Sequence, residues 1–272
     1  MLKFKKYCIF AFSLRKVHGK YLQYIKWHIA YNDTVNSQIY NVKRRYQKQM
    51  KEPSIDKYLV STCLFTIDEL NILYGGYRKD NLKVEADTKF NEMDLTVRLG
   101  YPFKQTVHYT VGESIKTRKE QKINHDLYVE QKDFKIEIKY LKNWKTSFNT
   151  WTATKVWSVF QQDFDWLMDE IDSGKKGKVA FIIGWFNCVE SFSQLIQLGT
   201  GNGAYPMVDE KKLLYFPFLT RGREPTRTRD LKYNYDLAYK IRTINQVGIR
   251  KGEYNCMFLG NESDCFHFAI YY

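Results

Sequence analysis

The clearest alternation of apolar and polar positions runs from residue 123 to residue 140. Because successive side chains of a strand point to opposite faces, this alternation predicts a hairpin that turns over Gln131 and Lys132. The same register places Asp126 directly opposite Glu137 on the polar face. The other face is expected to pack on a core; it consists of Leu127, Val129, Phe134, Ile136 and Ile138, flanked by Ile123 and Tyr140, with His125 as a polar exception.

A helical period follows the hairpin. Large apolar residues recur every three or four positions, and Ser173 with Gly174 closes this pattern. From Lys178 to Phe186 the chain is almost continuously apolar, which predicts a buried strand. The apolar positions of the predicted helix are Trp157, Phe160, Phe164, Leu167 and Ile171.

Weaker patterns precede the hairpin. A capping box at residues 66–69 predicts a helix that begins there and ends at the glycine pair 75–76. Alternation over 93–99 and over 105–111 predicts strands. The order over residues 61–187 is therefore helix, strands, hairpin, helix and buried strand. This order predicts an α/β or α+β fold with a mixed sheet flanked by helices.

Positive charge is concentrated at the two ends of the chain. The net charge is +13; residues 1–60 carry 13 Lys and Arg against three acids, and residues 221–251 carry nine against three. This layout favours a polyanionic partner that both ends contact. We expect a basic, aromatic-rich N-terminal region over 1–60, a core over 61–220, and a basic C-terminal extension over 221–272 that packs on the core.

Composition argues against several classes of protein. The chain is 44% hydrophobic, which is ample for a buried core. Its five cysteines are irregularly spaced, so they predict neither a disulfide framework nor a zinc ribbon, and a reducing cytosol is expected. Residues 1–16 have too short an apolar centre for a signal peptide, and no stretch is long and apolar enough to span a membrane.

Other catalytic motifs are missing from the sequence. The histidines are scattered without a metal-binding spacing, and no Gly-x-Ser-x-Gly elbow occurs. Gly199, Gly201 and Gly203 lack the lysine and the following helix of a nucleotide-binding loop, so they predict a flexible turn.

The polar face of the predicted hairpin carries the candidate chemistry. Opposed side chains in a hairpin have Cβ atoms about 5 Å apart, so Asp126 and Glu137 repel each other unless a cation lies between them. Carboxylates are hard oxygen ligands, which Mg²⁺ prefers. Lys139 lies two residues beyond Glu137 on the same face. The three residues predict a metal site for phosphodiester hydrolysis, in which Lys139 orients a metal-activated water or stabilises charge on the transition state.

The tripeptide at 137–139 carries little information alone. An acid, any residue and a lysine occur in this order eight times in the chain. Only the copy at 137–139 lies in an alternating strand, faces an Asp across a hairpin, and precedes an amphipathic helix and a buried strand. The alternative is a half-solvated hairpin whose lysines balance its acids. The copies begin at Asp87, Glu120, Glu130, Asp133, Glu137, Asp209, Glu210 and Asp230.

Asp126 is followed eleven positions later by Glu137-Ile138-Lys139, and then by the predicted helix and strand. This arrangement resembles the PD-(D/E)XK nuclease superfamily, which includes many type II restriction endonucleases. The resemblance covers about residues 61–187. It implies a restriction-endonuclease-like core in which Asp126, Glu137 and the backbone carbonyl of Ile138 hold Mg²⁺ or Mn²⁺ and Lys139 is the catalytic lysine. The family's usual proline before the Asp is His125 here.

The resemblance also implies accessory residues. Members often add a Glu from the helix that precedes the sheet, for which Glu69 and Glu113 are the candidates. Some carry a Gln on the helix after the motif, for which Gln161 or Gln162 can serve. The alternatives are that Glu69 is only a helix cap and that the glutamines are ordinary surface side chains.

Two basic stretches are expected to contact DNA phosphates. Their aromatic neighbours can stack on bases, and the second stretch reads as an arm or loop that becomes ordered on binding. The candidates are Lys43, Arg44 and Arg45 in the first stretch, and Arg221, Arg223, Arg227 and Arg229 in the second.

These patterns together predict a cytosolic, Mg²⁺-dependent DNA endonuclease, either of the restriction type or from a phage or mobile element. One alternative is a nucleic-acid-binding protein on the same fold that cuts nothing. Another is a structural or assembly protein with a basic surface. A homodimer would suit a palindromic recognition site, but the sequence carries no interface signal, and it does not separate DNA from RNA.

Overall fold

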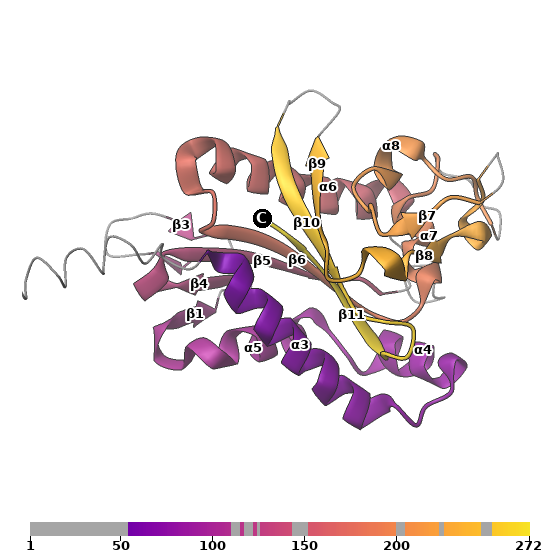
Figure 1. Cartoon of the computed structure of the whole chain (residues 1–272), viewed down its shortest axis with the longest axis horizontal. Coiled ribbons are helices and arrows are strands. Elements are labelled where there is room, and N and C mark those ends of the chain that lie inside the picture. Colours follow the sequence, from indigo (N-terminus) through magenta and orange to yellow (C-terminus); the bar gives the residue numbers. More distant parts are fainter. Residues whose placement is uncertain are drawn as a thin grey trace, which may run out of the picture. The chain divides into compact units, whose positions relative to one another are not determined.

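A seven-stranded mixed sheet forms the centre of the computed structural model (Figure 1). The structure describes residues 54–109, 115–116, 122–123, 126–142, 152–199, 205–222, 226–245 and 252–272. Residues 54–272 form one unit, which is separate from residues 1–53. The expected boundary at residue 60 is thus displaced, because a helix that begins at Ile55 runs across it.

The strands of the large sheet lie in the order β1, β4, β5, β6, β11, β10 and β9. Strands β5 and β6 are parallel, and the other neighbours are antiparallel. The predicted mixed sheet is confirmed, and the fold is of the α+β class. The bounds are β1 Val107–Tyr109, β4 Leu127–Val129, β5 Phe134–Tyr140, β6 Val179–Phe186, β9 Ile241–Asn245, β10 Glu253–Leu259 and β11 Phe266–Tyr271.

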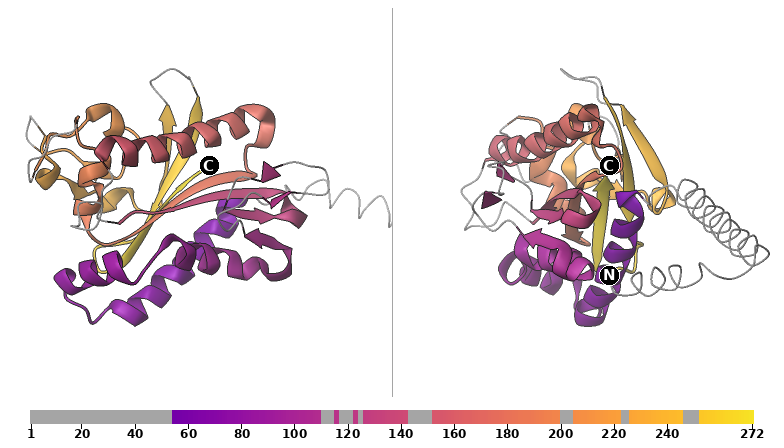
Figure 2. Two further views of the ribbon diagram at one scale, coloured as in Figure 1. Left: turned by 180° about the vertical axis from the view of Figure 1, so that it is seen from behind. Right: turned by 90° about the vertical axis from the view of Figure 1, so that its left-hand side faces the viewer.

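Helices cover both faces of this sheet (Figures 1 and 2). One face packs against α3 (Ile55–Tyr74), α4 (Lys79–Thr88) and α5 (Glu92–Gly100), and the other against α6 (Ala153–Glu170). The smaller helices are α7 (Phe192–Leu195) and α8 (Glu210–Leu213). Two short strand pairs lie outside the large sheet: β2 (Ile115–Lys116) with β3 (Lys122–Ile123), and β7 (Leu219–Thr220) with β8 (Lys232–Tyr233). The structure also has 3-10 turns at Tyr101–Thr106, Glu130–Lys132, Val189–Ser191, Thr228–Asp230 and Tyr235–Leu237, and a π turn at Ile171–Lys175.

The covering helices create a hydrophobic cluster on each side of the sheet. Ile136 and Ile138 of β5 pack with Leu95 of α5 on one side, and Phe181 of β6 packs with Phe164 of α6 on the other. All eight residues of β6 are buried, as expected for a strand covered on both faces. The predicted buried strand and the predicted helix before it are therefore confirmed.

The hairpin has the predicted register. Leu127 pairs with Ile136, and Val129 pairs with Phe134. A 3-10 turn over Glu130–Lys132 connects the strands, and Asp133 closes it in the left-handed region at φ 53°. The apolar face of β5 is buried at every second residue, as the alternation predicted. The side chains of Ile123 and His125 lie outside the described set.

Two predictions on the segment before the hairpin are wrong. Residues 93–99 form helix α5 rather than a strand: Leu95 and Leu99 are buried one helical turn apart, while Val97 between them is exposed. Helix α3 ends before the predicted glycine pair, but it begins at Ile55 instead of at the capping box, because apolar residues of the preceding turns also reach the core. Of residues 105–111, only Val107–Tyr109 form a strand in the described set.

Residues 221–272 are part of the core rather than an extension that packs on it. Strands β10 and β11 lie inside the large sheet, and β11 pairs directly with β6. The segment around Arg227 also packs against the folded core, because Thr226 and Thr228 are buried. Arg223 lies outside the described residues. The basic composition of the C-terminal segment led to the prediction of an extension, although the segment contains strands of the central sheet.

The sequence predicts neither disulfides nor a membrane-spanning helix, and both features can be examined in the described part of the chain. Its cysteines Cys63, Cys188, Cys256 and Cys265 are free thiols. Its helices include none that has both the length and the apolar character needed to cross a bilayer. Cys8, Gly201 and Gly203 lie outside the described residues.

Candidate metal and catalytic site

The edge of β5 beside β4 is where the predicted metal ligands meet. The pairing of β4 with β5 stops at Leu127 and Ile136. The next N–H groups along that edge of β5 therefore lie beyond the end of β4 and do not pair with it. Asp126 Oδ2 accepts a hydrogen bond from the Ile138 N–H at 2.8 Å, and Glu92 Oε2 accepts one from the Tyr140 N–H at 3.2 Å. Because the N–H and C=O groups of one strand residue point to the same side of the strand, the Ile138 carbonyl faces this edge as well.

Helix α5 brings Glu92 to this edge. Asn91 and Asp94 form a capping box that starts the helix, and Glu92 is its first residue. The helix comes close to the sheet at Gly184, where an added Cβ would lie 2.7 Å from Leu95 Cδ2. Gly184 is the register partner of Tyr140 on β5. Close packing at one glycine therefore places the first turn of α5 beside the end of β5.

Lys139 lies between two further carboxylates. Its Nζ is 2.9 Å from Glu137 Oε1 and 3.5 Å from Asp163 Oδ2, and it donates to the Ile138 carbonyl oxygen at 3.3 Å. The side chains of Glu137, Lys139 and Asp163 are 13%, 15% and 14% exposed, so water screens their charges only weakly. We refer to Glu92, Asp126, Glu137 and Asp163 as the carboxylate cluster.

Helix α6 fixes the position of Asp163. The Thr152 side chain caps the helix by accepting from the Lys155 N–H at 3.2 Å. Phe160 and Phe164 are fully buried against the sheet. Asp163 is three residues after Phe160, so it shares the sheet-facing side of the helix with the apolar residues. Its carboxylate is therefore held over β5 by the packing of its neighbours.

The carboxylate cluster retains protons that isolated carboxyl groups would lose. Burial, reinforced by the charges of Asp126 and Asp163, raises the pKa of Glu137 to about 8 although Lys139 opposes the change. Burial also raises the pKa of Asp163 to about 7, and it raises the pKa values of Asp126 and Glu92. Burial alone would lower the pKa of Lys139, but the surrounding carboxylates raise it, so this ammonium stays charged.

These shifts predict that the metal-free protein loses stability as the pH rises. Glu137 and Asp163 bind protons more tightly in the folded state, with pKa values of about 8 and about 7 against ordinary values of 4.5 and 3.8. Between the ordinary and the raised values the native state holds more protons, so the free energy of unfolding falls with pH. We expect urea titrations in chelator to show the free energy of unfolding falling by up to about 6 kcal/mol between about pH 5 and about pH 8. An unchanged free energy of unfolding over this range would mean that both groups are already ionised in the native state.

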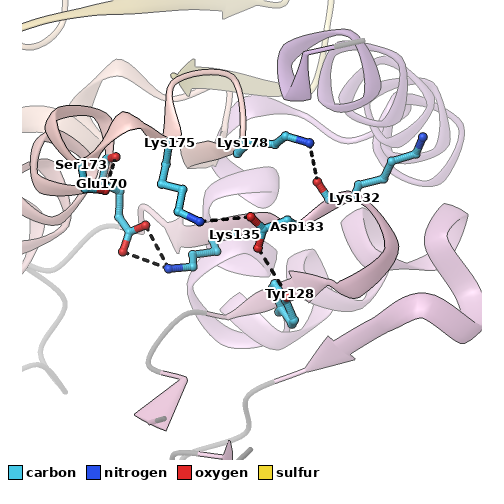
Figure 3. Close-up of polar contacts among 8 residues, drawn as sticks. All are labelled: Tyr128, Lys132, Asp133, Lys135, Glu170, Ser173, Lys175 and Lys178. Carbon is cyan, nitrogen blue, oxygen red and sulfur yellow. Dashed lines mark hydrogen bonds and ion pairs between the residues drawn. The ribbon is translucent and has the colours of Figure 1, made fainter. Parts of the chain in front are cut away.

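A second polar cluster lies toward the hairpin turn, and there the charges are balanced (Figure 3). Lys135, on the same face of β5 as Glu137, contacts the two carboxylate oxygens of Glu170 at 3.0 and 2.9 Å. Lys175 pairs with Asp133 at 3.1 Å. The half-solvated hairpin with balanced charges thus describes the turn end, whereas Lys139 faces several acids at once.

The donor set of the carboxylate cluster fits a hard divalent cation. Its donors, with the Ile138 carbonyl, are all oxygens, as Mg²⁺ prefers. Asp163 Oδ2 is buried and has no hydrogen-bond partner in the described part of the chain. Among the described residues, no three His, Cys, Asp or Glu side chains are grouped as they would be around a bound metal. Asp126 and Glu137 fit as ligands only in the chemistry of their oxygen atoms and in their placement at one edge of β5, and their ligand roles stay predictions.

The site brings together three residues that the sequence predicts and two that it does not. Asp126, Glu137 and Lys139 meet at the edge of β5, as expected. Glu92 and Asp163 join them and were not among the candidates. A capping pattern at Asn91 and an acid on the apolar side of a helix were the signals that could have revealed them.

The accessory candidates differ in their surroundings. Glu69 forms an ion pair with Arg98 at 2.6 Å and lines a groove of about 550 Å³ between α3 and α5. Gln161 and Gln162 are exposed on α6. Glu113 lies outside the described residues.

The candidate phosphate-contacting residues are only partly described. Arg221 is 52% exposed and pairs with Glu210 at 2.9 Å. Arg229 is exposed, and its guanidinium lies 5.8 Å from the centre of the Tyr205 ring. Arg227 donates to the Tyr205 carbonyl at 3.4 Å. The remaining candidates, Lys43, Arg44, Arg45 and Arg223, lie outside the described residues.

Comparison with known proteins adds no family assignment. No family model matches the chain, and no curated protein or solved structure matches it either. The arrangement of the carboxylate cluster around Lys139 is therefore the basis for a functional assignment.

Proposed function

We propose that the chain is a Mg²⁺-dependent nuclease that hydrolyses phosphodiester bonds in DNA, with a core of the PD-(D/E)XK type. One observation carries this proposal. Asp126, which directly precedes β4, and Glu137 of β5 lie at the same edge, where Lys139 Nζ is 2.9 Å from Glu137 Oε1. A strand lysine beside two acids is the arrangement that the resemblance implies.

The order of elements supports the same proposal. Helices precede β1 and the hairpin β4–β5, and α6 then connects β5 to the parallel strand β6. This is the sequence of helix, strand, acid-bearing hairpin, helix and buried strand that accompanies the resemblance. The additional strands β9, β10 and β11 extend the sheet beyond β6.

Each residue of the site has a chemical role in this proposal. Asp126, Glu137 and the Ile138 carbonyl would hold the metal ion, with Mn²⁺ as a substitute for Mg²⁺. The bound ion would polarise the phosphate and lower the pKa of a coordinated water. Lys139 would donate a hydrogen bond to a phosphoryl oxygen, where its charge stabilises the transition state. Glu92 would take the accessory role for which Glu69 and Glu113 were the candidates.

The proposed substrate rests on charge. The net charge of +13 favours a polyanion. Arg221 and Arg229 are exposed, and phosphates would compete with Glu210 and Asp230, with which these arginines form ion pairs. A restriction enzyme or a nuclease of a phage or mobile element would suit a cytosolic protein of this kind. If the recognition site is palindromic, we propose that the protein acts as a homodimer.

A second candidate is a nucleic-acid-binding protein that keeps the fold without cutting. One observation favours it: Lys139 Nζ lies 2.9 Å from Glu137 Oε1 and 3.3 Å from the Ile138 carbonyl oxygen, the atoms that a metal ion would need. Such a protein would bind DNA in a salt-dependent manner with or without divalent metal.

Plasmid cleavage separates the two candidates. We expect supercoiled plasmid to be nicked or linearised with Mg²⁺ and left intact with chelator. Lys139→Ala should slow cleavage by about 10²-fold, the typical loss when one charge-stabilising donor is removed. Lys135→Ala is the matched control on the same strand face and should retain activity. DNA binding without cleavage under all conditions would support the binding protein and contradict the nuclease.

A further inference from the structure

Lys139 contacts the atoms that the proposed metal ion would need. Its Nζ lies 2.9 Å from Glu137 Oε1 and 3.3 Å from the Ile138 carbonyl oxygen. These are two of the three ligands in the proposed site. An ammonium and a divalent cation repel each other, so they cannot share these oxygens at contact distance.

Lys139 must therefore leave these oxygens before they can ligate a cation. Its side chain is long and flexible, which permits a shift of its ammonium without movement of β5. The ammonium is largely buried, so it needs another anionic partner nearby. Asp163 Oδ2 already lies 3.5 Å from Nζ, which is close for an ion pair but long for a hydrogen bond.

Asp163 is better placed as this partner than the other members of the carboxylate cluster. Asp126 is bonded to the Ile138 N–H, and Glu92 is bonded to the Tyr140 N–H. Asp163 Oδ2 is buried without a hydrogen-bond partner in the described part of the chain. It also comes from a helix whose neighbouring Phe164 is fully buried, so its position is fixed.

We propose that Asp163 is a positioning residue that receives the Lys139 ammonium when Glu137 and the Ile138 carbonyl bind a divalent cation. It thereby sets the cation affinity of the site through Lys139. This inference rests on the proposed metal site and adds a coupling that the PD-(D/E)XK resemblance did not imply. The competing role for Asp163 is that of a direct ligand.

A double-mutant cycle distinguishes these roles. Mn²⁺ binding is measured by electron paramagnetic resonance on the full chain, for wild type, Asp163→Asn, Lys139→Met and the double variant. We expect Asp163→Asn alone to weaken binding by about 10-fold, as is typical when a residue that supports a ligand is removed. In the Lys139→Met background, Asp163→Asn should weaken Mn²⁺ binding by less than about 3-fold, because no ammonium has to move away from the metal ligands.

The remaining outcomes each overturn the proposal. An equal loss in both backgrounds would make Asp163 a direct ligand, and no loss in either would remove it from the site. Asp165→Asn is the control, since Asp165 lies about 200° further around α6 and should leave binding unchanged. Far-ultraviolet circular dichroism of each variant confirms folding before the comparison.

The cycle also separates this inference from the nuclease proposal, because it does not measure cleavage. Additive losses would overturn the coupling while leaving the nuclease intact. Coupled losses in a protein that never cuts DNA would keep the coupling and overturn the nuclease. A wild-type protein that binds no Mn²⁺ would overturn both.

Discussion

Glu137→Gln is expected to abolish DNA cleavage and, at the same time, to stabilise the chelated protein. The substitution removes the charge of a proposed metal ligand, so cleavage should fall by at least about 10³-fold. It also removes a buried carboxyl group whose ionisation is opposed by burial and by Asp126 and Asp163. We therefore expect the free energy of unfolding at about pH 8 to rise by up to about 4 kcal/mol.

Plasmid cleavage and urea titration in chelator measure the two effects on the same preparations. Glu130→Gln is the matched control, because Glu130 belongs to the same hairpin but is exposed in the turn. It should change neither quantity. A Glu137→Gln protein that is less stable than wild type at this pH would show that the ion pair with Lys139 outweighs the repulsion among the acids. Retained cleavage would remove Glu137 from the proposed site.

The hairpin could be predicted in detail because local rules determine it. Strict alternation fixes which face is buried, and a shift of one residue would turn Ile136 and Ile138 toward the polar side. The opposition of Asp126 and Glu137 follows from this register alone. Helix α6 was predictable for the same reason, since its apolar positions recur at the helical period over several turns.

Helix α5 shows where local pattern fails. Met93, Leu95, Val97 and Leu99 alternate in the sequence, which indicates a strand, yet only Leu95 and Leu99 are buried. Alternation and helical spacing coincide over so short a segment, and contact with Gly184 of a distant strand decides between them. The capping pair Asn91 and Asp94 was the one local signal in favour of the helix.

The missed site residues follow from the same limits. Glu92 could not be assigned to the site while its segment was interpreted as a strand. Asp163 lies in a correctly predicted helix, but the resemblance implies a glutamine at this place and so favours Gln161 or Gln162. An acid at the spacing of Phe160 and Leu167 belongs to the buried side of the helix, and a buried acid needs a partner. Asp163 meets both conditions, since its side chain is 14% exposed and lies 3.5 Å from Lys139 Nζ.

Phe164→Ala is expected to cause the largest loss of stability among the changes considered. Phe164 is fully buried, and its ring centre lies 4.7 Å from that of Tyr215, 4.9 Å from Tyr271 and 5.0 Å from Phe181. Truncation leaves a cavity between α6 and the sheet, which typically costs about 3–5 kcal/mol. Urea titration should show this loss in the free energy of unfolding.

The same substitution tests whether α6 holds the site together. Asp163 is the neighbour of Phe164, so a looser α6 should also weaken Mn²⁺ binding under conditions where the variant is still folded. Phe65→Ala is the matched control, since Phe65 is 76% exposed on α3 and its loss should change stability by less than about 0.5 kcal/mol. Equal stability losses in the two variants would mean that α6 does not pack on the sheet as described. A large stability loss with unchanged Mn²⁺ affinity would instead show that the site forms without a fixed Asp163, which would contradict its positioning role.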